Sequence, residues 1–176
     1  MNVIPEFEVR EIMQSDIALI VNYWMTSSTD HLIGMGVDLK KMPTAEQLTF
    51  MLSEQINQSY KEKNSYCIIW LCNGIPIGHC NINKIVFGSH AYMHLHIWKG
   101  MNRKKGTGVE LINRSVTYFF ENMKLKKLYC EPYALNPAPN KTLAKAGFHF
   151  LKRYTTTPGA MNFEQEVNLW ELSEQN

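Results

Sequence analysis

Residues 103–108 read RKKGTG, and a helical pattern of apolar side chains follows directly over residues 107–123. Two glycines allow the backbone of such a turn to approach a ligand closely. A helix that begins there directs unpaired N–H groups and a partial positive charge at the same point. Three consecutive cations add to this field, so the segment predicts a site for a diphosphate or another polyanion. The alternative is a solvated connection between two elements.

Other phosphate-binding patterns fit this segment less well. The pattern G-x-x-x-x-G-K of nucleoside triphosphatases is absent, and Leu111 stands where the dinucleotide fingerprint needs its third glycine. The segments before the turn have the pattern of antiparallel strands, which argues against a parallel dinucleotide-binding unit. The predicted polyanion is therefore neither NAD nor a triphosphate.

Upstream of the turn, the chain predicts three consecutive antiparallel strands. Residues 66–71 and 75–82 are strand-like, and Asn73-Gly74 between them is a strong signal for a two-residue hairpin. Residues 91–98 predict the third strand, again antiparallel to its neighbour.

The amino-terminal part predicts one strand and two helices. Residues 7–12 alternate apolar and charged side chains as a half-buried strand does, and a Ser-Asp pair at 15–16 can cap the helix that follows. Residues 26–42 are polar and contain glycine, so they predict a mobile loop. Thr44 with Gln47 then resembles a capping box ahead of a second amphipathic helix.

Downstream of the turn, the chain alternates between helix and strand. After the helix at 107–123, residues 127–131 predict a strand parallel to the one at 91–98, because a helical crossover joins the two. A short helix follows and ends before Gly147. Two closing strands complete the pattern, at residues 148–154 and 166–172.

This order of elements predicts an α+β fold, with a mixed, mostly antiparallel seven-stranded sheet flanked by about four helices. A chain of 176 residues is long enough for one ordinary core and too short for two comfortable ones. We therefore expect one domain over residues 1–176.

Two motifs carry a family resemblance. Residues 103–108 match the pyrophosphate pattern Q/R-x-x-G-x-G/A of the GNAT acyltransferases, and residues 136–148, NPAPNKTLAKAGF, match the family's Asn, short helix, Gly-Phe segment. The order of elements agrees over essentially the whole chain. The sequence thus resembles the GNAT superfamily, and in particular its RimJ/RimL-like acetyltransferases. This resemblance implies that the fourth and fifth strands are parallel and splay apart.

The resemblance also implies that acetyl-CoA is the cosubstrate. Backbone amides of the turn would hold its diphosphate, and the pantetheine arm would run beside the fourth strand. Asn136 would hydrogen-bond this arm, while Asn140 and Leu143 would line its far side. The residues assigned in this way are Ile97, Trp98, Arg103, Lys104, Lys105, Gly106, Thr107, Gly108, Asn136, Asn140 and Leu143.

Catalysis needs a group that takes a proton from the amine, because an amine is mostly protonated at neutral pH. His94 and His96 lie on one face of the strand predicted at 91–98, next to the expected thioester. The arylalkylamine acetyltransferases of the same superfamily also carry histidines on this strand. His94 and His96 are therefore candidate bases, and Glu131 after the next strand is a third. The alternative is that the histidines are hydrogen-bonded core residues.

The expected general acid is missing from its usual place. Many members of the superfamily have a tyrosine seven residues after the motif asparagine, where this chain has Leu143. Tyr133, Tyr154 or water are possible substitutes, and the sequence assigns no acid.

Composition excludes several other classes of protein. A net charge of +2 and a pI near 8.3 fall short of the basic excess of a nucleic-acid-binding protein. No apolar run approaches the roughly 18 residues that cross a bilayer, and the amino terminus lacks a signal-peptide pattern, so we expect a cytoplasmic protein. The four cysteines form no C-x-x-C pair, and no metal site is predicted.

The sequence therefore predicts an N-acetyltransferase that moves an acetyl group from acetyl-CoA to a primary amine, by direct attack and preferably on a small molecule. Acetylation of a protein amino terminus, as of ribosomal proteins, is an alternative. A CoA-binding module without catalysis is another. Both a monomer and a homodimer are compatible with the sequence.

Overall fold

The computed structural model describes residues 5–98 and 106–174 of the chain. Its seven strands form one sheet in the order β1-β2-β3-β4-β5-β7-β6, in which only β4 and β5 are parallel neighbours. The strands are β1 (Phe7–Glu11), β2 (Tyr66–Cys72), β3 (Ile75–Val86), β4 (His90–Ile97), β5 (Lys127–Cys130), β6 (His149–Thr156) and β7 (Gln165–Ser173). The predicted mixed sheet is confirmed.

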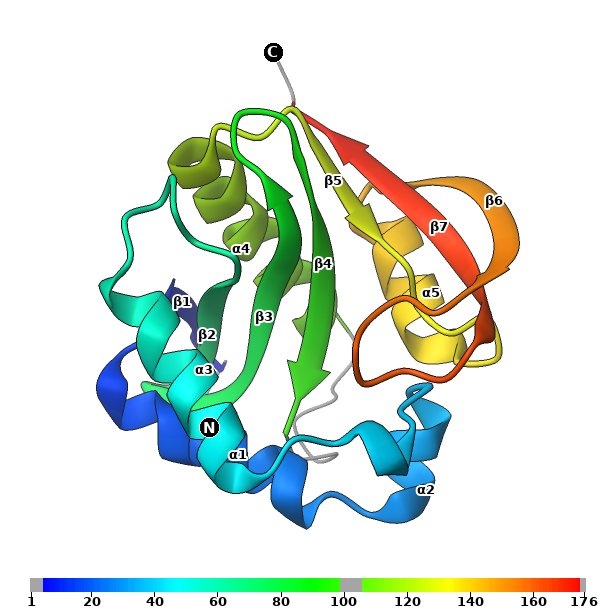
Figure 1. The fold of residues 1–176 in the computed structure, drawn as a ribbon. Coiled ribbons are helices and arrows are strands. Elements are labelled where there is room, and N and C mark those ends of the chain that lie inside the picture. The colour runs from blue at the N-terminus through cyan, green and yellow to red at the C-terminus, as the bar shows by residue number, and fades with distance from the viewer. Residues whose placement is uncertain (1–4, 99–105, 175–176) are drawn as a thin grey trace.

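Helices lie on both faces of this sheet (Figure 1). Helices α1 and α3 cover one face of the amino-terminal strands, and α4 and α5 lie behind the sheet in the same view. The helices are α1 (Ile17–Thr26), α2 (Thr29–Gly34), α3 (Ala45–Asn57), α4 (Thr107–Met123) and α5 (Pro137–Lys145), with short 3₁₀ turns at Gln14–Asp16 and Leu39–Lys41. None of the helices in the described part of the chain combines the length and the apolar character needed to cross a membrane.

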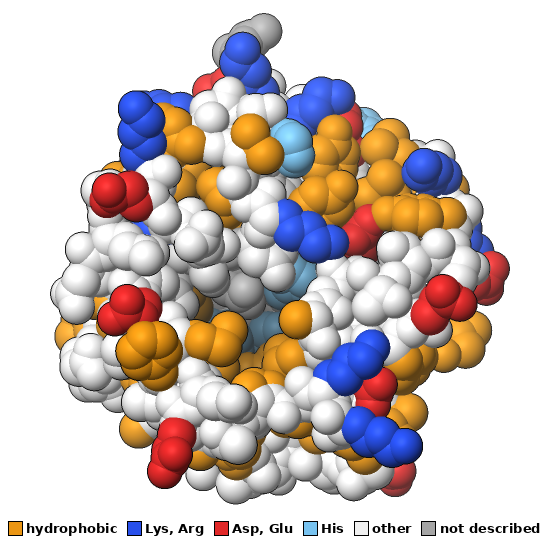
Figure 2. All heavy atoms as spheres, viewed as in Figure 1, with side chains coloured by type: hydrophobic (Ala, Val, Ile, Leu, Met, Phe, Trp, Pro, Cys, Tyr) orange, Lys and Arg blue, Asp and Glu red, His pale blue; other side chains and the backbone are white. Residues whose placement is uncertain are grey.

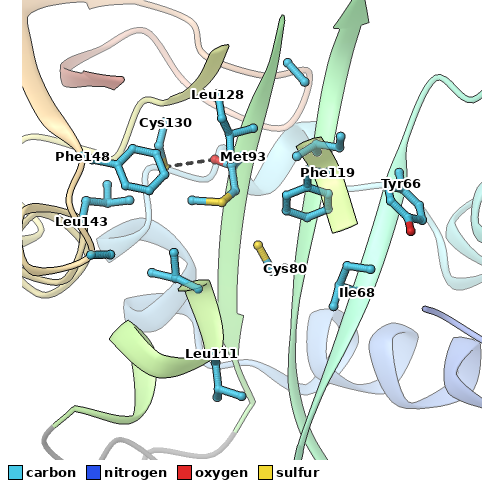
Figure 3. Packing of buried hydrophobic residues seen from close by; sticks show 14 of the residues in the cluster. Tyr66, Ile68, Cys80, Met93, Leu111, Phe119, Leu128, Cys130, Leu143 and Phe148 are labelled. Carbon is cyan, nitrogen blue, oxygen red and sulfur yellow. Dashed lines mark hydrogen bonds between the residues drawn. The ribbon is translucent and has the colours of Figure 1, made fainter. Parts of the chain in front are cut away.

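Strand β2 separates two hydrophobic cores because its side chains alternate between the faces of the sheet. Ile68 and Trp70 contribute to the core under α4 and α5, whereas Ile69 and Leu71 contribute to the core under α1 and α3. All four side chains are buried. Figure 3 shows part of the first core, where Phe119 of α4, Leu143 of α5 and Phe148 after α5 pack against the sheet.

Local signals set several element boundaries as predicted. Asn73 and Gly74 both have positive φ angles, 51° and 74°, as the tight hairpin between β2 and β3 requires. Thr44 and Gln47 form the expected capping box at the start of α3, with Thr44 Oγ1 accepting from Gln47 N at 3.2 Å.

The parallel strands β4 and β5 diverge partway along their length. They pair through His90, Ala91 and Tyr92 of β4 only, although β4 continues to Ile97. At the point of divergence the Cys130 thiol donates to the carbonyl oxygen of Met93 at 3.0 Å (Figure 3). The predicted splayed pair is confirmed, and it opens the sheet toward the start of α4.

The prediction of a mobile loop over residues 26–42 is wrong. This segment contains α2 and the 3₁₀ turn after it, so the described residues hold five α-helices instead of about four. Ser28 caps α2 by accepting from His31 N, and Leu32 is buried. A six-residue helix is too short to give a periodic apolar pattern, which is why the sequence did not reveal it.

The segment that follows α2 is hydrogen-bonded to the loop between β6 and β7 and to the first residue of β7. The carbonyl oxygen of Gly36 accepts from Gln165 Nε2 and from Asn162 Nδ2, each at 2.9 Å. Asp38 N donates to Met161 O at 2.8 Å. Two segments that are far apart in sequence thus form one continuous wall beside the open end of the sheet.

Candidate active site

A cleft of about 610 Å³ occupies the gap where β4 and β5 diverge. Figure 2 shows a hollow near the centre of this face of the molecule, with histidine surface at its bottom. Its walls come from β4, from the segment after β5, from the starts of α4 and α5, from α2 and from the β6–β7 loop. Lining residues with polar or ionisable side chains include Tyr23, Asp30, His31, His94, His96, Glu131, Tyr133, Asn136, Lys141, Thr142, Lys145, Asn162 and Gln165.

The amino terminus of α4 lies at one end of this cleft. Gly106 is the N-cap of the helix and has a φ of +90°, and the first intrahelical hydrogen bond runs from Glu110 N to Gly106 O. Gly106 and Gly108 both line the cleft, and Thr107 is buried between them. The first N–H groups of the helix therefore have no partner within it, as an anion site needs. Arg103, Lys104 and Lys105 lie outside the described residues.

The backbone of β4 also offers hydrogen-bonding groups to the cleft. Trp98 N donates to Ile77 O of β3, whereas Met93 O faces β5 and accepts from Cys130. Because the direction of backbone groups alternates along a strand, the N–H and C=O groups of Leu95 and Ile97 point toward the gap. The predicted binding residue Ile97 lies at this open edge and lines the cleft.

The other residues predicted to bind the cosubstrate differ in how deeply their side chains are buried in the protein. Asn136 lines the cleft at the start of α5. Asn140 is half-buried, and both its amide nitrogen and its amide oxygen are hydrogen-bonded within the protein. Leu143 is fully buried in the core under α4 and α5. Trp98 packs against the other core, and its Nε1 donates to His79 Nδ1 at 2.8 Å.

The side-chain amide of Asn140 links α5 to β7. Its Nδ2 donates to the carbonyl oxygens of Asn136, at 2.8 Å, and Tyr133, at 3.3 Å. Its Oδ1 accepts from Asn168 Nδ2 at 2.8 Å and from Trp170 Nε1 at 2.9 Å. This arrangement fixes the helix that forms one side of the cleft.

Both predicted histidine bases line the cleft from β4. The Nε2 atom of His94 lies 3.0 Å from Asn83 Oδ1, and His96 stacks on His79 with ring centroids 4.7 Å apart. Burial lowers the pKa of His94 to about 4 and that of His79 to about 3, and it also lowers the pKa of His96 well below 6.5. These rings are neutral at physiological pH and can therefore accept a proton.

Glu131 is the third predicted base and lies in the same cleft. Its side chain is only 5% exposed; Tyr154 donates its hydroxyl proton to Oε1, and Lys84 Nζ lies 4.0 Å from Oε2. Burial raises the pKa of this carboxyl, while Lys84 and Lys152 oppose the shift. The structure thus brings His94, His96 and Glu131 to one cavity. Within the described ranges, no three His, Cys, Asp or Glu side chains are placed to hold a metal ion.

Sequence reasoning missed Tyr23, which reaches this site from α1. Its Oη lies 3.1 Å from His31 Nε2 and 3.4 Å from His96 Nδ1. In the sequence, Tyr23 is one more aromatic residue on the apolar face of a helix. A polar tip on a residue at such a position is the only local signal that could have indicated it.

A model of the acetyltransferase (GNAT) domain family matches residues 7–149 of the chain. This range contains the α4 turn, both diverging strands and α5. The comparison with curated protein sequences gave no match.

Solved structures share this architecture over nearly the whole chain. Spermidine N-acetyltransferase from Vibrio cholerae, in complex with CoA and spermine, is 17% identical with a TM-score of 0.75, covering 95% of each chain. Ribosomal-protein-S5-alanine acetyltransferase from Vibrio fischeri is 18% identical with a TM-score of 0.76, covering 95% of this chain and 92% of the other. RimL, a ribosomal L7/L12 α-N-protein acetyltransferase in complex with CoA, is 12% identical with a TM-score of 0.75, covering 95% and 93%. At these identities the similarity shows a shared fold.

Proposed function

The chain belongs to the GNAT acetyltransferase family, and on this premise we propose that it transfers the acetyl group of acetyl-CoA to a primary amine of a small molecule. One observation carries the proposal: the unpaired amides of the α4 turn, the open edge of β4 and two neutral histidines all face a single cleft. An anion site, an extended groove and a proton acceptor are the parts that the reaction requires.

The described residues fit acetyl-CoA in both charge and shape. The α4 amino terminus would hold the diphosphate, with Arg103, Lys104 and Lys105 directly before it in sequence. The pantetheine arm would lie along β4, where the backbone groups of Leu95 and Ile97 can pair with its amides as a strand would. Asn136 faces the opposite side of the same groove.

The reaction needs an amine without its proton. In direct attack, the nitrogen lone pair forms a bond to the thioester carbonyl carbon, and the nitrogen must then lose a proton as the C–S bond breaks. A neutral imidazole is suited to accept that proton, and both His94 and His96 are neutral and line the cleft. We propose His96 as the base, because it has a hydrogen-bonded neighbour that can take the proton further.

The departing thiolate takes its proton from water or from a residue other than 143. Leu143 has no ionisable group and is fully buried in the core. Tyr133 lines the cleft beside Asn136 and is the nearest tyrosine in sequence to the motif.

The shape of the acceptor end favours a small molecule. Asp30, His31 and Met35 of the α2 region face this end, and Asn162 of the β6–β7 loop and Gln165 at the start of β7 lie on the same side. These two segments are hydrogen-bonded to each other, so the wall is continuous. A continuous wall with one carboxylate and one thioether suits a small amine better than an extended peptide.

Release of free thiol from acetyl-CoA in the presence of candidate amines tests the proposal. The panel should contain arylalkylamines, aliphatic diamines and polyamines, and peptides with free amino termini. We expect turnover with at least one class of small amine. Turnover with peptides alone would establish the protein amino terminus as the acceptor, and CoA binding without any turnover would show a binding module.

A further inference from the structure

We infer that Tyr23 and His31 form a path along which the proton that His96 takes from the amine leaves the active site. The inference rests on the proposed function. It concerns two residues from α1 and α2 that belong to neither sequence motif. They act through His96 and not on the substrate itself.

The side chains of His96 on β4, Tyr23 on α1 and His31 on α2 lie next to one another in this order. Tyr23 Oη lies 3.4 Å from His96 Nδ1 on one side and 3.1 Å from His31 Nε2 on the other. Both distances allow a hydrogen bond, although the first is long. Met35 Sδ lies 3.4 Å from the same oxygen, but a thioether is only a weak acceptor. All of these residues line the cleft.

The His96 ring is held in place by its neighbours. It stacks on His79 at 4.7 Å between centroids and meets the Trp24 ring at 4.9 Å. His79 in turn accepts from Trp98 Nε1 through its Nδ1, which fixes the tautomer of His79 with the proton on Nε2. The orientation of His96 toward Tyr23 is thus set by packing.

The proposed path uses one of the two hydrogen-bond directions that these distances allow. A hydroxyl has one proton, so when Tyr23 donates to His31 Nε2 it accepts from His96 Nδ1–H. This leaves His96 Nε2 unprotonated. Among the described residues, His96 Nε2 has no hydrogen-bond partner. It is not a buried atom either, because Gln55 Oε1 is the only buried side-chain polar atom of these residues that lacks a partner. His96 Nε2 is therefore open to the cleft, where the amine would lie.

The proton balance of the step is complete without a further reactant. His96 Nε2 forms a bond to the proton of the attacking nitrogen as the Nδ1–H bond breaks toward Tyr23. The Tyr23 O–H bond breaks toward His31 Nε2 in turn. His31 is half-buried and passes one proton to water. Each group is neutral after the step, with the ring protons of His96 and His31 moved to the other nitrogen. Transfer of the His96 Nε2 proton to the departing thiolate, with one proton returning from water along the same path, restores the starting tautomers.

A path matters here because the site disfavours a charged imidazole. His79 from β3 and His94 from β4 face His96, and Asp30 precedes His31 on α2. Burial, His79, His94 and His31 all lower the pKa of His96. An imidazolium formed in this place is short-lived, and transfer to Tyr23 removes it.

The variant Tyr23→Phe removes one oxygen and keeps the ring that packs on Trp24 and His79. We expect kcat to fall about tenfold or more, since positioned proton transfer contributes about 10²–10⁴ to rate. The KM for acetyl-CoA should stay the same. Tyr92→Phe is the matched control, because Tyr92 is on the same strand face as His96 but outside the cleft.

A double-mutant cycle tests whether the two residues act in one path. His31→Gln alone should lower kcat, and the double variant should lose little more than the worse single variant. Additive losses would mean that the residues act separately. An unchanged kcat in Tyr23→Phe would overturn the path and leave the proposed acetyl transfer intact.

Imidazole nitrogen NMR gives a readout independent of turnover. We expect His96 to carry its proton on Nδ1 in the unmodified protein and to move toward the Nε2 tautomer in Tyr23→Phe. A proton on Nε2 in the unmodified protein would overturn the path. If the unmodified protein turns over no amine, the proposed function fails and the path fails with it.

Discussion

Gly106 and Gly108 open α4 for different physical reasons. Gly106 has a φ of +90°, a region that L side chains rarely adopt, although a Cβ there would meet nothing within 4 Å. Gly108 has an ordinary backbone, but its Cβ would lie 3.1 Å from Thr142 Cγ2 of α5. The first glycine shapes the turn, and the second lets α5 approach it.

We expect Gly106→Val and Gly108→Val each to weaken CoA binding by about tenfold or more. Strain at the first position would misplace the helix amides, at a cost of about 1–3 kcal/mol, and bulk at the second would displace α5. Calorimetric titration with CoA measures the effect. Gly88→Val is the matched control, because Gly88 has a φ of +78° and open space but lies in the β3–β4 turn. Equal affinities for CoA in all variants would show that the turn at the start of α4 does not bind the cosubstrate.

The buried histidines should make stability depend on pH. His79 is 3% exposed, and its pKa in the folded protein is about 3, against about 6.5 when unfolded. The unfolded chain therefore binds more protons below pH 6.5, and stability falls as the pH drops from 6.5 toward 3. His79 alone contributes about 1.4 kcal/mol per pH unit in this window.

The variant His79→Asn removes this titration and keeps an acceptor near Trp98 Nε1. Urea unfolding between pH 7.5 and 5 should show a shallower loss of stability than in the unmodified protein. His149→Asn is the control, because His149 is exposed. A slope that does not change in His79→Asn would contradict the assignment of the buried neutral state.

At the scale of the elements, local signals accounted for most boundaries. The Asn73-Gly74 turn and the Thr44–Gln47 capping box are short-range features, and the structure has both. The six-residue helix α2 was missed because fewer than two helical turns give no recognisable repeat of apolar residues. The divergence of β4 from β5 followed only from the family resemblance, since no local pattern encodes which residues of two distant strands pair.

The candidate site was predictable where it lies on motifs and not where it depends on tertiary contacts. His94 and His96 share a strand, so their common face followed from alternation alone. Tyr23 and His96 are 73 residues apart, and their proximity depends on how α1 packs over β3 and β4. Apart from its hydroxyl group, nothing in the local sequence of α1 distinguishes Tyr23 from a core residue.

Asn140 should act mainly on stability, because its amide is saturated by protein groups. Asn140→Ala leaves the donors of Asn168 and Trp170 without their acceptor, and we expect a loss of about 2–4 kcal/mol in the free energy of unfolding. Chemical denaturation measures it. Asn113→Ala, at an exposed helical site, should change little. A stable Asn140→Ala protein with weakened CoA binding would instead show that Asn140 contacts the cosubstrate.

At the scale of the molecule, the two parts of the sheet are joined by a short parallel pairing of β4 with β5. A cosubstrate that pairs with the open edge of β4 would extend that connection. We expect CoA to slow amide hydrogen exchange at Leu95 and Ile97. The amide of Trp98 is the internal control, because it already donates to Ile77 O. Protection that is equal at all three amides would argue against strand-like binding.

The link between Gly36 and the β6–β7 loop has a further consequence for how substrates come and go. A Cβ at Gly36 would lie 2.1 Å from Gln165 Oε1, so the Gly36 backbone is in close contact with that side chain, and hydrogen bonds from Asn162, Gln165 and Asp38 reinforce the junction. A side of the entrance that is anchored in this way is poorly suited to act as a gate. Selection among amines would then depend on an active-site entrance whose width is fixed by the fold. The product would leave through the same entrance by which the substrate arrived.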